Sequence, residues 1–191
     1  MRSPIAHPVR RISLLIVLVA FGALALGGAP AAMAASACQS ASASPAQTGK
    51  RAIVRATLCT INAERASRGL GALRLNKRLS AAATAHAADM DTRNYFAHDS
   101  IGGSSFVDRI RRAGYLTGAR SWTVGENLAW GSGGRAAPAT ITQMWMNSPG
   151  HRANILSSSY REIGIGVADG APVAGGGNPA ATYATEFGAK S

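Results

Sequence analysis

The chain has 191 residues and carries a formal net charge of +11 at pH 7. This length fits one domain around a single hydrophobic core. Arginines outnumber lysines 17 to 3, so most of the positive charge is guanidinium, which suits phosphate and carboxylate partners.

The N-terminus has the pattern of a secretory signal peptide. Positively charged residues come first, and an uncharged, mostly aliphatic run at 12–26 and an A-x-A cleavage site at 32–34 follow. An uncleaved membrane anchor is the alternative, but this run is shorter than the roughly 20 residues that span a bilayer. We therefore predict that residues 1–34 are removed and that the remaining chain is soluble and secreted.

Removal of this peptide would take away Arg2, Arg10 and Arg11 and lower the net charge to +8. For an exported protein, this charge indicates anionic cell-wall polymers or a membrane surface as partners rather than nucleic acid. The alternative is that the scattered arginines only keep the protein in solution. We expect a monomer with no nucleic acid partner.

Cys38 and Cys59 are the two cysteines of the sequence. In an exported chain this even count predicts one disulfide bond, which would tie the N-terminal leader to the first helix. A lipidated Cys38 is the alternative, because residues 35–38 faintly resemble a lipobox. That alternative lacks the apolar residue expected three places before the cysteine, and it would leave Cys59 as a free thiol.

Residues 35–50 contain mainly small and polar residues and predict a flexible leader ahead of one folded domain at 51–191. Apolar residues at helical spacing then predict four helices. These helices cover residues 51–68, residues 79–90 with Asn76 as a candidate N-cap, a stretch that Ser104 or Ser105 caps and that ends at Gly114, and residues 138–147.

Two strands are predicted near the end of the chain, at 163–167 and 182–187, with a Gly/Pro-rich connection at 169–179. Residues 121–124 are a further candidate strand. Helices first and strands last indicate an α+β domain in which helices pack on an antiparallel sheet.

Three short segments, at 95–100, 125–131 and 145–156, carry the candidate functional residues. They contain His98, Glu126 and His151, which are separated by 28 and 25 residues. Local metal motifs do not have this spacing. The dipeptide Pro149-Gly150 predicts a sharp corner from which His151 projects into a cleft.

In their order and in their residues, these segments resemble the CAP superfamily of cysteine-rich secretory proteins, antigen 5 and plant pathogenesis-related proteins, in its short bacterial secreted form. The resemblance covers roughly residues 57–188 and includes residues 59–65, the helix with Asp108-Arg109-Ile110, and the strand at 163–167. It implies an α-β-α sandwich, with a central antiparallel sheet between helical layers and a cleft over the sheet. It also supports the disulfide, because secreted bacterial relatives often carry this cysteine pair.

In that family two histidines and two glutamates line the cleft, and in some members the histidines bind a divalent metal. The resemblance assigns His98, Glu126 and His151 to three of these positions. The fourth position, three residues after Trp145, holds Ser148. A serine hydroxyl cannot replace a carboxylate as a proton acceptor near neutral pH, so a catalytic role for Ser148 is doubtful.

The resemblance implies two classes of function. The first is a secreted binding module whose cleft holds a small apolar or amphipathic ligand, as described for relatives that bind sterols or fatty acids. The second is a weak metal-dependent hydrolase of peptides, esters or wall polymers. In the hydrolase, His98 and His151 would hold Zn²⁺ or another divalent ion and Glu126 would be the catalytic base. The missing second glutamate favours the binding module.

Other polar residues have structural interpretations, and His151 has one too, because it can hold a loop by bonding backbone carbonyls. His86 is expected to pack inside or on its Ala-rich helix. The serines near the third helix are expected to be caps (Ser100, Ser104, Ser105). The asparagines of the motifs are expected to bond loop backbone (Asn127, Asn154). The aromatic residues are expected to form the core around the cleft (Trp130, Trp145, Tyr160).

Overall fold

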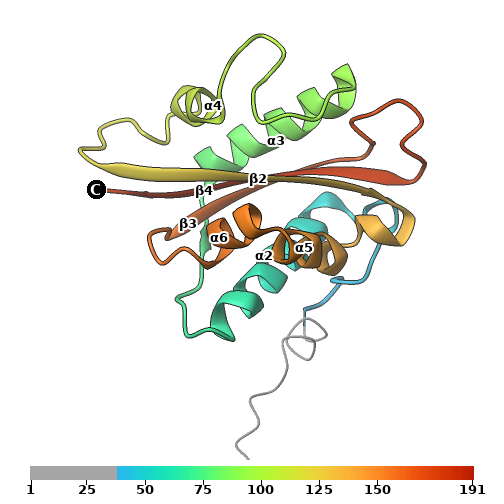
Figure 1. The fold of residues 1–191 in the computed structure, drawn as a ribbon, viewed down its shortest axis with the longest axis horizontal. Helices are drawn as coiled ribbons and strands as arrows, with labels where there is room; N and C mark the ends of the chain where they lie inside the picture. Colours follow the sequence, from blue (N-terminus) through green and yellow to red (C-terminus); the bar gives the residue numbers. More distant parts are fainter. Residues whose placement is uncertain (1–37) are drawn as a thin grey trace, which may run out of the picture.

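A four-stranded sheet with the order β1-β3-β4-β2 forms the middle layer of the molecule (Figure 1). The strands are β1 (Arg74–Leu75), β2 (Trp122–Ser132), β3 (Glu162–Ala168) and β4 (Ala180–Lys190). The central strand β4 pairs antiparallel with β2 and β3, and the short β1 pairs parallel with β3. The predicted antiparallel pairing is therefore confirmed for the three long strands, and β1 makes the sheet mixed.

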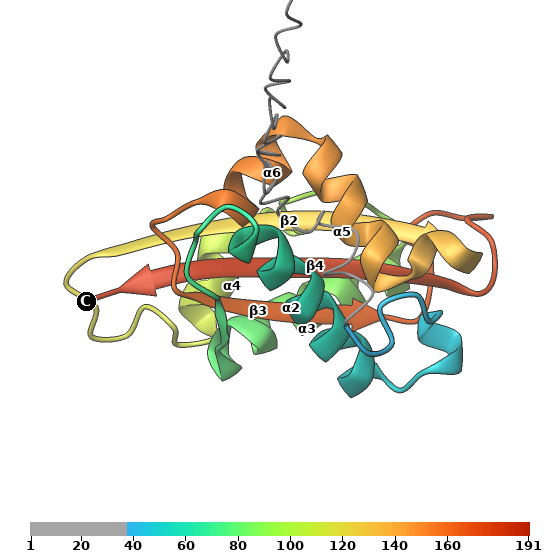
Figure 2. The ribbon, with the colours of Figure 1, turned by 90° about the horizontal axis from the view of Figure 1, so that it is seen from below.

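Helices cover both faces of this sheet (Figures 1 and 2). One face carries α2 (Lys50–Ala66), α5 (Pro138–Asn147) and α6 (Pro149–Leu156), and the other carries α3 (Lys77–Arg93) and α4 (Phe106–Arg112). Two 3-10 turns, η1 (Pro45–Gln47) and η2 (Gly133–Ala136), complete the elements. The predicted α-β-α sandwich of the α+β class is confirmed.

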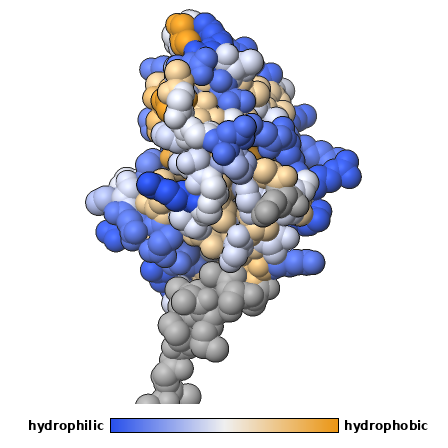
Figure 3. Space-filling view, turned by 90° about the vertical axis from the view of Figure 1, so that its right-hand side faces the viewer, coloured by the Kyte–Doolittle hydropathy of each residue, from blue (hydrophilic) through white to orange (hydrophobic). Residues whose placement is uncertain are grey.

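The structure is a computed structural model, and it describes residues 38–191. The predicted signal peptide lies outside these residues. Within the described range, no helix combines the length and the apolar character that crossing a bilayer requires. Hydrophilic side chains cover much of the end of the molecule seen in Figure 3, with apolar residues in small areas between them.

Local sequence signals determine where α3 and α4 begin. The Asn76 side chain accepts hydrogen bonds from the backbone amides of Arg78 and Leu79, as expected of an N-cap. Ser105 and Asp108 form a capping box at the start of α4. These caps hold the two helices that supply polar side chains to the site.

Small residues bring α3 close to β3. A Cβ atom at Gly164 or Gly166 would overlap the α3 backbone at Leu79 or Ala83, so only glycine fits at these strand positions. Ala83 and Ala87 are fully buried in the same contact. The glycines of β3 and the alanines of α3 therefore allow the helix and the strand to pack closely, which places the next turn of α3 over the sheet.

The main hydrophobic core lies on the opposite face, between the sheet and α2, α5 and α6. Its largest buried side chains include Trp145, Tyr183 and Phe187. The Trp145 indole donates a hydrogen bond to the Leu128 carbonyl of β2 at 2.9 Å, which anchors α5 to that strand. This core fixes β2 and α5 relative to each other, and the candidate cavity described below lies between them.

The structure extends one sequence prediction and corrects another. The candidate strand at 121–124 is the start of β2, which continues to Ser132, so Glu126 lies inside a strand. The predicted corner at Pro149-Gly150 is the first turn of α6, and His151 therefore extends from a helix. Proline is common in the first turn of a helix, because the amide hydrogen that it lacks would have no acceptor within the helix there.

The predicted disulfide between Cys38 and Cys59 is confirmed, with a Cα–Cα distance of 5.7 Å. It joins the N-terminal segment to α2, which contains Cys59. The Ala139 amide of α5 also donates a hydrogen bond to the Ala41 carbonyl at 2.9 Å. The described part of the leader is thus attached to two helices on the same face of the sheet.

Candidate functional site

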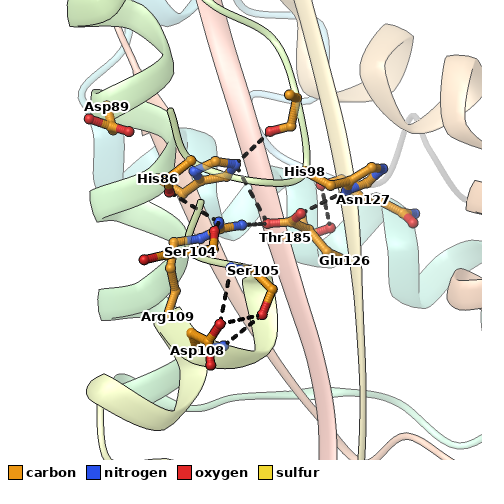
Figure 4. A network of polar contacts seen from close by, with 12 residues as sticks. His86, Asp89, His98, Ser104, Ser105, Asp108, Arg109, Glu126, Asn127 and Thr185 are labelled. Atoms are coloured by element: carbon orange, nitrogen blue, oxygen red, sulfur yellow. Dashed lines mark hydrogen bonds and ion pairs between the residues drawn. The ribbon is translucent and has the colours of Figure 1, made fainter. Parts of the chain in front are cut away.

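Glu126 is the residue around which the polar side chains of the site converge (Figure 4). Its side chain is only 1% exposed, on the face of the sheet that α3 and α4 cover. Its Oε1 atom lies 2.7 Å from Nδ1 of His98, and its Oε2 atom lies 2.6 Å from Nη2 of Arg109. The structure thus brings together His98 and Glu126, as the sequence predicts, and adds Arg109.

His98 lies in the loop at 94–105 between α3 and α4, and two buried side chains hold this loop. The Nε2–H group of His86 on α3 donates to the Ala97 carbonyl at 3.0 Å. Nη1 of Arg109 on α4 donates to the Ser104 carbonyl at 3.1 Å and to Oγ of Ser100 at 3.3 Å. The imidazole of His98 is consequently directed at Glu126 by contacts on both sides of it in sequence.

Three histidines near the site differ in their electrostatics. The hydrogen bond to Glu126 raises the pKa of His98, whose side chain is 55% exposed. Burial lowers the pKa of His151, and the charge of His98 lowers it further. Burial also lowers the pKa of His86, which is fully buried. As the pH falls, His98 is therefore the first of the three to gain a proton.

The Glu126–Arg109 contact is a buried ion pair, since the Arg109 side chain is only 6% exposed. Such a pair gains little over apolar packing, but removal of one partner leaves an uncompensated buried charge and costs about 3–5 kcal/mol. Loss of either member is therefore expected to destabilise the fold. The sequence pattern placed Arg109 on a helix but did not identify its contact with Glu126.

His151 and Ser148 lie at α6, against the other side of β2. Nδ2 of Asn127 donates to the His151 carbonyl at 3.0 Å, and Nδ2 of Asn154 donates to the Glu126 carbonyl at 3.0 Å. The two motif asparagines therefore bind backbone, as expected, but the carbonyls they bind lie in α6 and β2 rather than in a loop. They also fasten α6 to the strand that carries Glu126.

A cavity of about 440 Å³ lies between β2 and α5, next to α6. Most of its wall is apolar, and His151, Ser148 and Arg135 supply polar groups. Its volume is within the range of small-molecule pockets. His98 and Glu126 are not part of its wall, so the predicted cleft residues divide into a buried polar cluster and an adjoining cavity. The larger apolar side chains in the wall are Phe96, Leu128, Trp130, Met144 and Trp145.

The predicted metal site does not fit a closed zinc centre. Among residues 38–191 no group of three or more His, Cys, Asp and Glu side chains is arranged to hold a metal ion. Nδ1 of His98 is bonded to Glu126, which leaves Nε2 as the ring atom that could bind a metal. Structural zinc sites use four ligands and catalytic sites three protein ligands, so His98 and His151 alone would bind a metal weakly.

Glu186 is a second acidic residue of the site, and it was not identified from the sequence. It stands directly opposite Glu126 in the pairing of β2 with β4, and its side chain is fully buried. The available signal was its place in the strand predicted at 182–187. Successive side chains of a strand point to opposite faces, so Glu186 shares a face with Ala184, while Tyr183 and Phe187 point to the other face. A charged residue at a buried strand position is uncommon. Its role depends on the residue that lies opposite in the neighbouring strand.

Most residues with structural interpretations are placed as expected, but Ser100 and Ser104 accept hydrogen bonds from arginine side chains instead of capping a helix. His86 is buried inside the fold, Ser105 caps α4, and Trp145 and Tyr160 are buried around the cavity side of the sheet. Ser104 accepts a hydrogen bond from Nη1 of Arg112 at 3.0 Å.

The model of the cysteine-rich secretory protein (CAP) family matches residues 58–176, which is more than half of the chain. The chain belongs to the CAP family. The match spans all three motif segments, so the resemblance seen in the sequence is confirmed.

Two proteins of Bacillus subtilis (strain 168) are similar to this CAP chain in sequence. Uncharacterized protein YkwD is 39% identical over 105 residues, which are 55% of this chain and 38% of YkwD. Uncharacterized membrane protein YlbC is 34% identical over 106 residues, which are 56% of this chain and 29% of YlbC. The chain thus matches less than two fifths of the length of each relative.

Solved structures share the fold. An extracellular protein with an SCP domain from Bacillus anthracis has a TM-score of 0.59 at 27% identity, over 72% of this chain and 40% of its own. An outer surface protein from Borrelia burgdorferi has a TM-score of 0.55 at 19% identity, over 69% of this chain and 87% of its own. A cysteine-rich secretory protein from Staphylococcus aureus has a TM-score of 0.52 at 20% identity, over 73% and 38%. The last two likenesses concern the fold alone.

Replacement of Glu126 by glutamine is expected to lower the pKa of His98 below its ordinary value of about 6.5. The amide removes the acceptor that favours the charged imidazole, and the charge of Arg109 is then uncompensated. Because the folded-state pKa of His98 is raised, its contribution to stability is present below about pH 6.5 and is lost as the pH rises through the folded value. Titration of the imidazole signals by NMR measures the change.

Glu162→Gln is the matched control, because Glu162 accepts hydrogen bonds from Asn76 and Tyr115 instead. An unchanged His98 titration in Glu126→Gln would contradict the proposed cause of the shift. Since Glu126→Gln also leaves Arg109 unpaired, the double variant Glu126→Gln/Arg109→Met is expected to be the more stable of the two.

Proposed function

We propose that this protein is an exported binding module that holds a small apolar or amphipathic ligand in the cavity between β2 and α5. The observation that carries the proposal is the cavity itself, with about 440 Å³ of space and a mainly apolar wall. Burial of apolar surface supplies the affinity of such a site, and a few polar groups orient the ligand. The polar residues of the wall include Ser132, Arg135, Ser148 and His151.

The state of Glu126 favours binding over hydrolysis. A general base must reach the proton that it removes, directly or through one water. Both oxygens of Glu126 are bonded, one to His98 and one to Arg109, and the side chain is almost fully buried. Ser148 at the cavity wall is not a proton acceptor near neutral pH. The polar cluster therefore orients His98 better than it activates a water.

Export is supported by the disulfide and by the relatives. Disulfide bonds persist in oxidising compartments outside the cytosol, and the Bacillus anthracis neighbour is described as extracellular. A secreted monomer that contacts an anionic wall polymer or membrane surface through its arginines is consistent with the positive charge of the sequence.

The alternative is a weak metal-dependent hydrolase, and the observation in its favour is the direct contact between a histidine and a buried glutamate. In that case His98 and His151 would bind a divalent cation such as Zn²⁺, in the micromolar range or weaker. The ion would be released as the imidazoles gain protons at lower pH.

Truncation of Phe96 is expected to weaken ligand binding. Phe96 lines the cavity and is 43% exposed, so a ligand can cover it further. Loss of about 1 kcal/mol of apolar contact corresponds to roughly fivefold lower affinity. Fluorescence titration with anilinonaphthalene sulfonate, an amphipathic probe, measures the dissociation constants of wild type and Phe96→Ala.

Ile101→Ala is the matched control, because Ile101 is an exposed apolar residue of the same loop outside the cavity wall. Its affinity for the probe should stay within a factor of about two of wild type. Equal affinities for all three proteins, or no saturable binding by wild type, would contradict the cavity as the binding site.

A substrate panel separates the two functional classes. We expect no turnover of ester, peptide or wall-polymer substrates by the wild-type protein, with or without Zn²⁺. Turnover that Glu126→Gln abolishes in a protein still folded by circular dichroism would establish the hydrolase instead. Calorimetric titration with Zn²⁺ completes the comparison, because equal heats for wild type and His98→Ala/His151→Ala would exclude the histidine pair as ligands.

A further inference from the structure

The pairing of β2 with β4 sets two glutamates side by side in the interior. Glu126 and Glu186 are directly paired residues of neighbouring strands. As whole residues, main chain included, they are 5% and 0% exposed. The Cβ atoms of such pairs lie about 4.5–5.5 Å apart on the same face of a sheet. Two carboxyl groups therefore share one small space between the sheet and the helices α3 and α4.

Only one permanent positive charge among the described residues faces this space. Arg109 from α4 donates to Glu126 at 2.6 Å, and its Nη1 atom is bonded to the loop. His98 is bonded to the other oxygen of Glu126. His86 from α3 is 3.9 Å from Glu126, but its burial keeps it in the neutral form. Asp89, also on α3, pairs instead with Arg93. The available charge is thus directed at Glu126.

Glu186 lacks the contacts that an ionised carboxylate needs. Neither of its oxygens has a hydrogen bond of good geometry with a donor among the described residues. A charged carboxylate without such donors is very costly to bury, and a carboxyl group in this position gains a proton instead. The proton then has one natural acceptor, the carboxylate of Glu126 on the neighbouring strand.

We propose that Glu186 is a neutral carboxylic acid under physiological conditions and directs its proton to Glu126, which makes it a positioning residue for the Glu126–His98 pair. The cluster thereby contains the second carboxyl group that Ser148 does not provide, contributed by β4 and already protonated. Glu126 then accepts hydrogen bonds from three side chains: His98, Arg109 and, in this proposal, Glu186. Together these three donors restrict its side chain to the orientation that faces His98.

The direction of the pKa shift agrees with this geometry. Burial raises the pKa of Glu186 well above the ordinary value, and the charge of Glu126 and its hydrogen bond add to the increase. The charge of Arg109 acts in the opposite direction and is the smallest of these influences. The folded protein therefore binds a proton at Glu186 over a pH range in which the unfolded chain does not.

This difference makes stability fall as the pH rises above about 4.3, the ordinary pKa of a glutamate. In the variant Glu186→Gln the neutral amide mimics the protonated acid and cannot lose a proton. The ratio of its folding equilibrium constant to that of wild type should therefore rise with pH, by up to about tenfold per unit, until the folded-state pKa of Glu186 is reached.

The test is equilibrium unfolding of wild type, Glu186→Gln and the control Glu162→Gln between about pH 5 and pH 8. A ratio that rises with pH for Glu186→Gln but not for Glu162→Gln is the expected result. A ratio that is flat or falls with pH would show that Glu186 is ionised and would overturn the proposal. Infrared spectroscopy gives a second readout, because a protonated carboxyl stretch near neutral pH should be present in wild type and absent from Glu186→Gln.

The positioning role is tested separately by the NMR titration of His98. Glu186→Gln still donates to Glu126 and should leave the His98 titration unchanged. Glu186→Leu cannot donate, so Glu126 becomes a stronger acceptor and His98 should retain its proton to higher pH. If both variants titrate like wild type, Glu186 does not position the pair. Because no ligand is used, failure of the binding proposal would leave this test unaffected.

Discussion

The buried ion pair between Glu126 and Arg109 is the interaction on which the site depends. It joins β2 to α4 across the space beneath α3, with an oxygen–nitrogen distance of 2.6 Å. The same arginine holds the backbone at Ser104, and the same glutamate binds His98. One interaction therefore connects the sheet, a helix and the loop that carries the exposed histidine. Because a lone buried charge costs several kcal/mol, replacement of either partner alone is expected to destabilise the fold.

The rest of the fold places these two residues within reach of each other. Gly164 and Gly166 allow α3 to lie directly on β3, and the capping box at Ser105 sets the start of α4 one turn before Arg109. On the opposite face, the packing of Trp145 against β2 fixes the strand that carries Glu126. The cavity extends along the outer edge of β2, with residues from both faces of that strand and Phe96 of the His98 loop in its wall, and the polar cluster lies beside it. In our account a ligand contacts the cavity, while the cluster orients His98 beside it.

Much of the architecture was predictable from local signals, and much of the site was not. A helix cap such as Asn76 and the Gly-x-Gly pattern of β3 are signals contained within a few residues. The predicted bounds of α3 and β3 are therefore close to the observed ones. The short helix α6 was missed because Pro149-Gly150 is equally typical of a turn. The pairing of His98 with Glu126 came from family resemblance, since no local rule connects residues so far apart. Arg109 and Glu186 were not identified because their roles depend on tertiary contacts and strand register.

Hydrogen exchange in the variant Arg109→Met tests the central claim most directly. Each charged hydrogen bond is worth about 1.5–3 kcal/mol, so loss of the bonds to the loop should speed exchange at residues 97–104 by roughly tenfold or more. The amides of β3 and β4 should stay far better protected than those of the loop, because the sheet ladder and the main core remain. Unchanged exchange in the loop, or an equal increase in the loop and in β4, would contradict the view that the Glu126–Arg109 pair holds His98 in place.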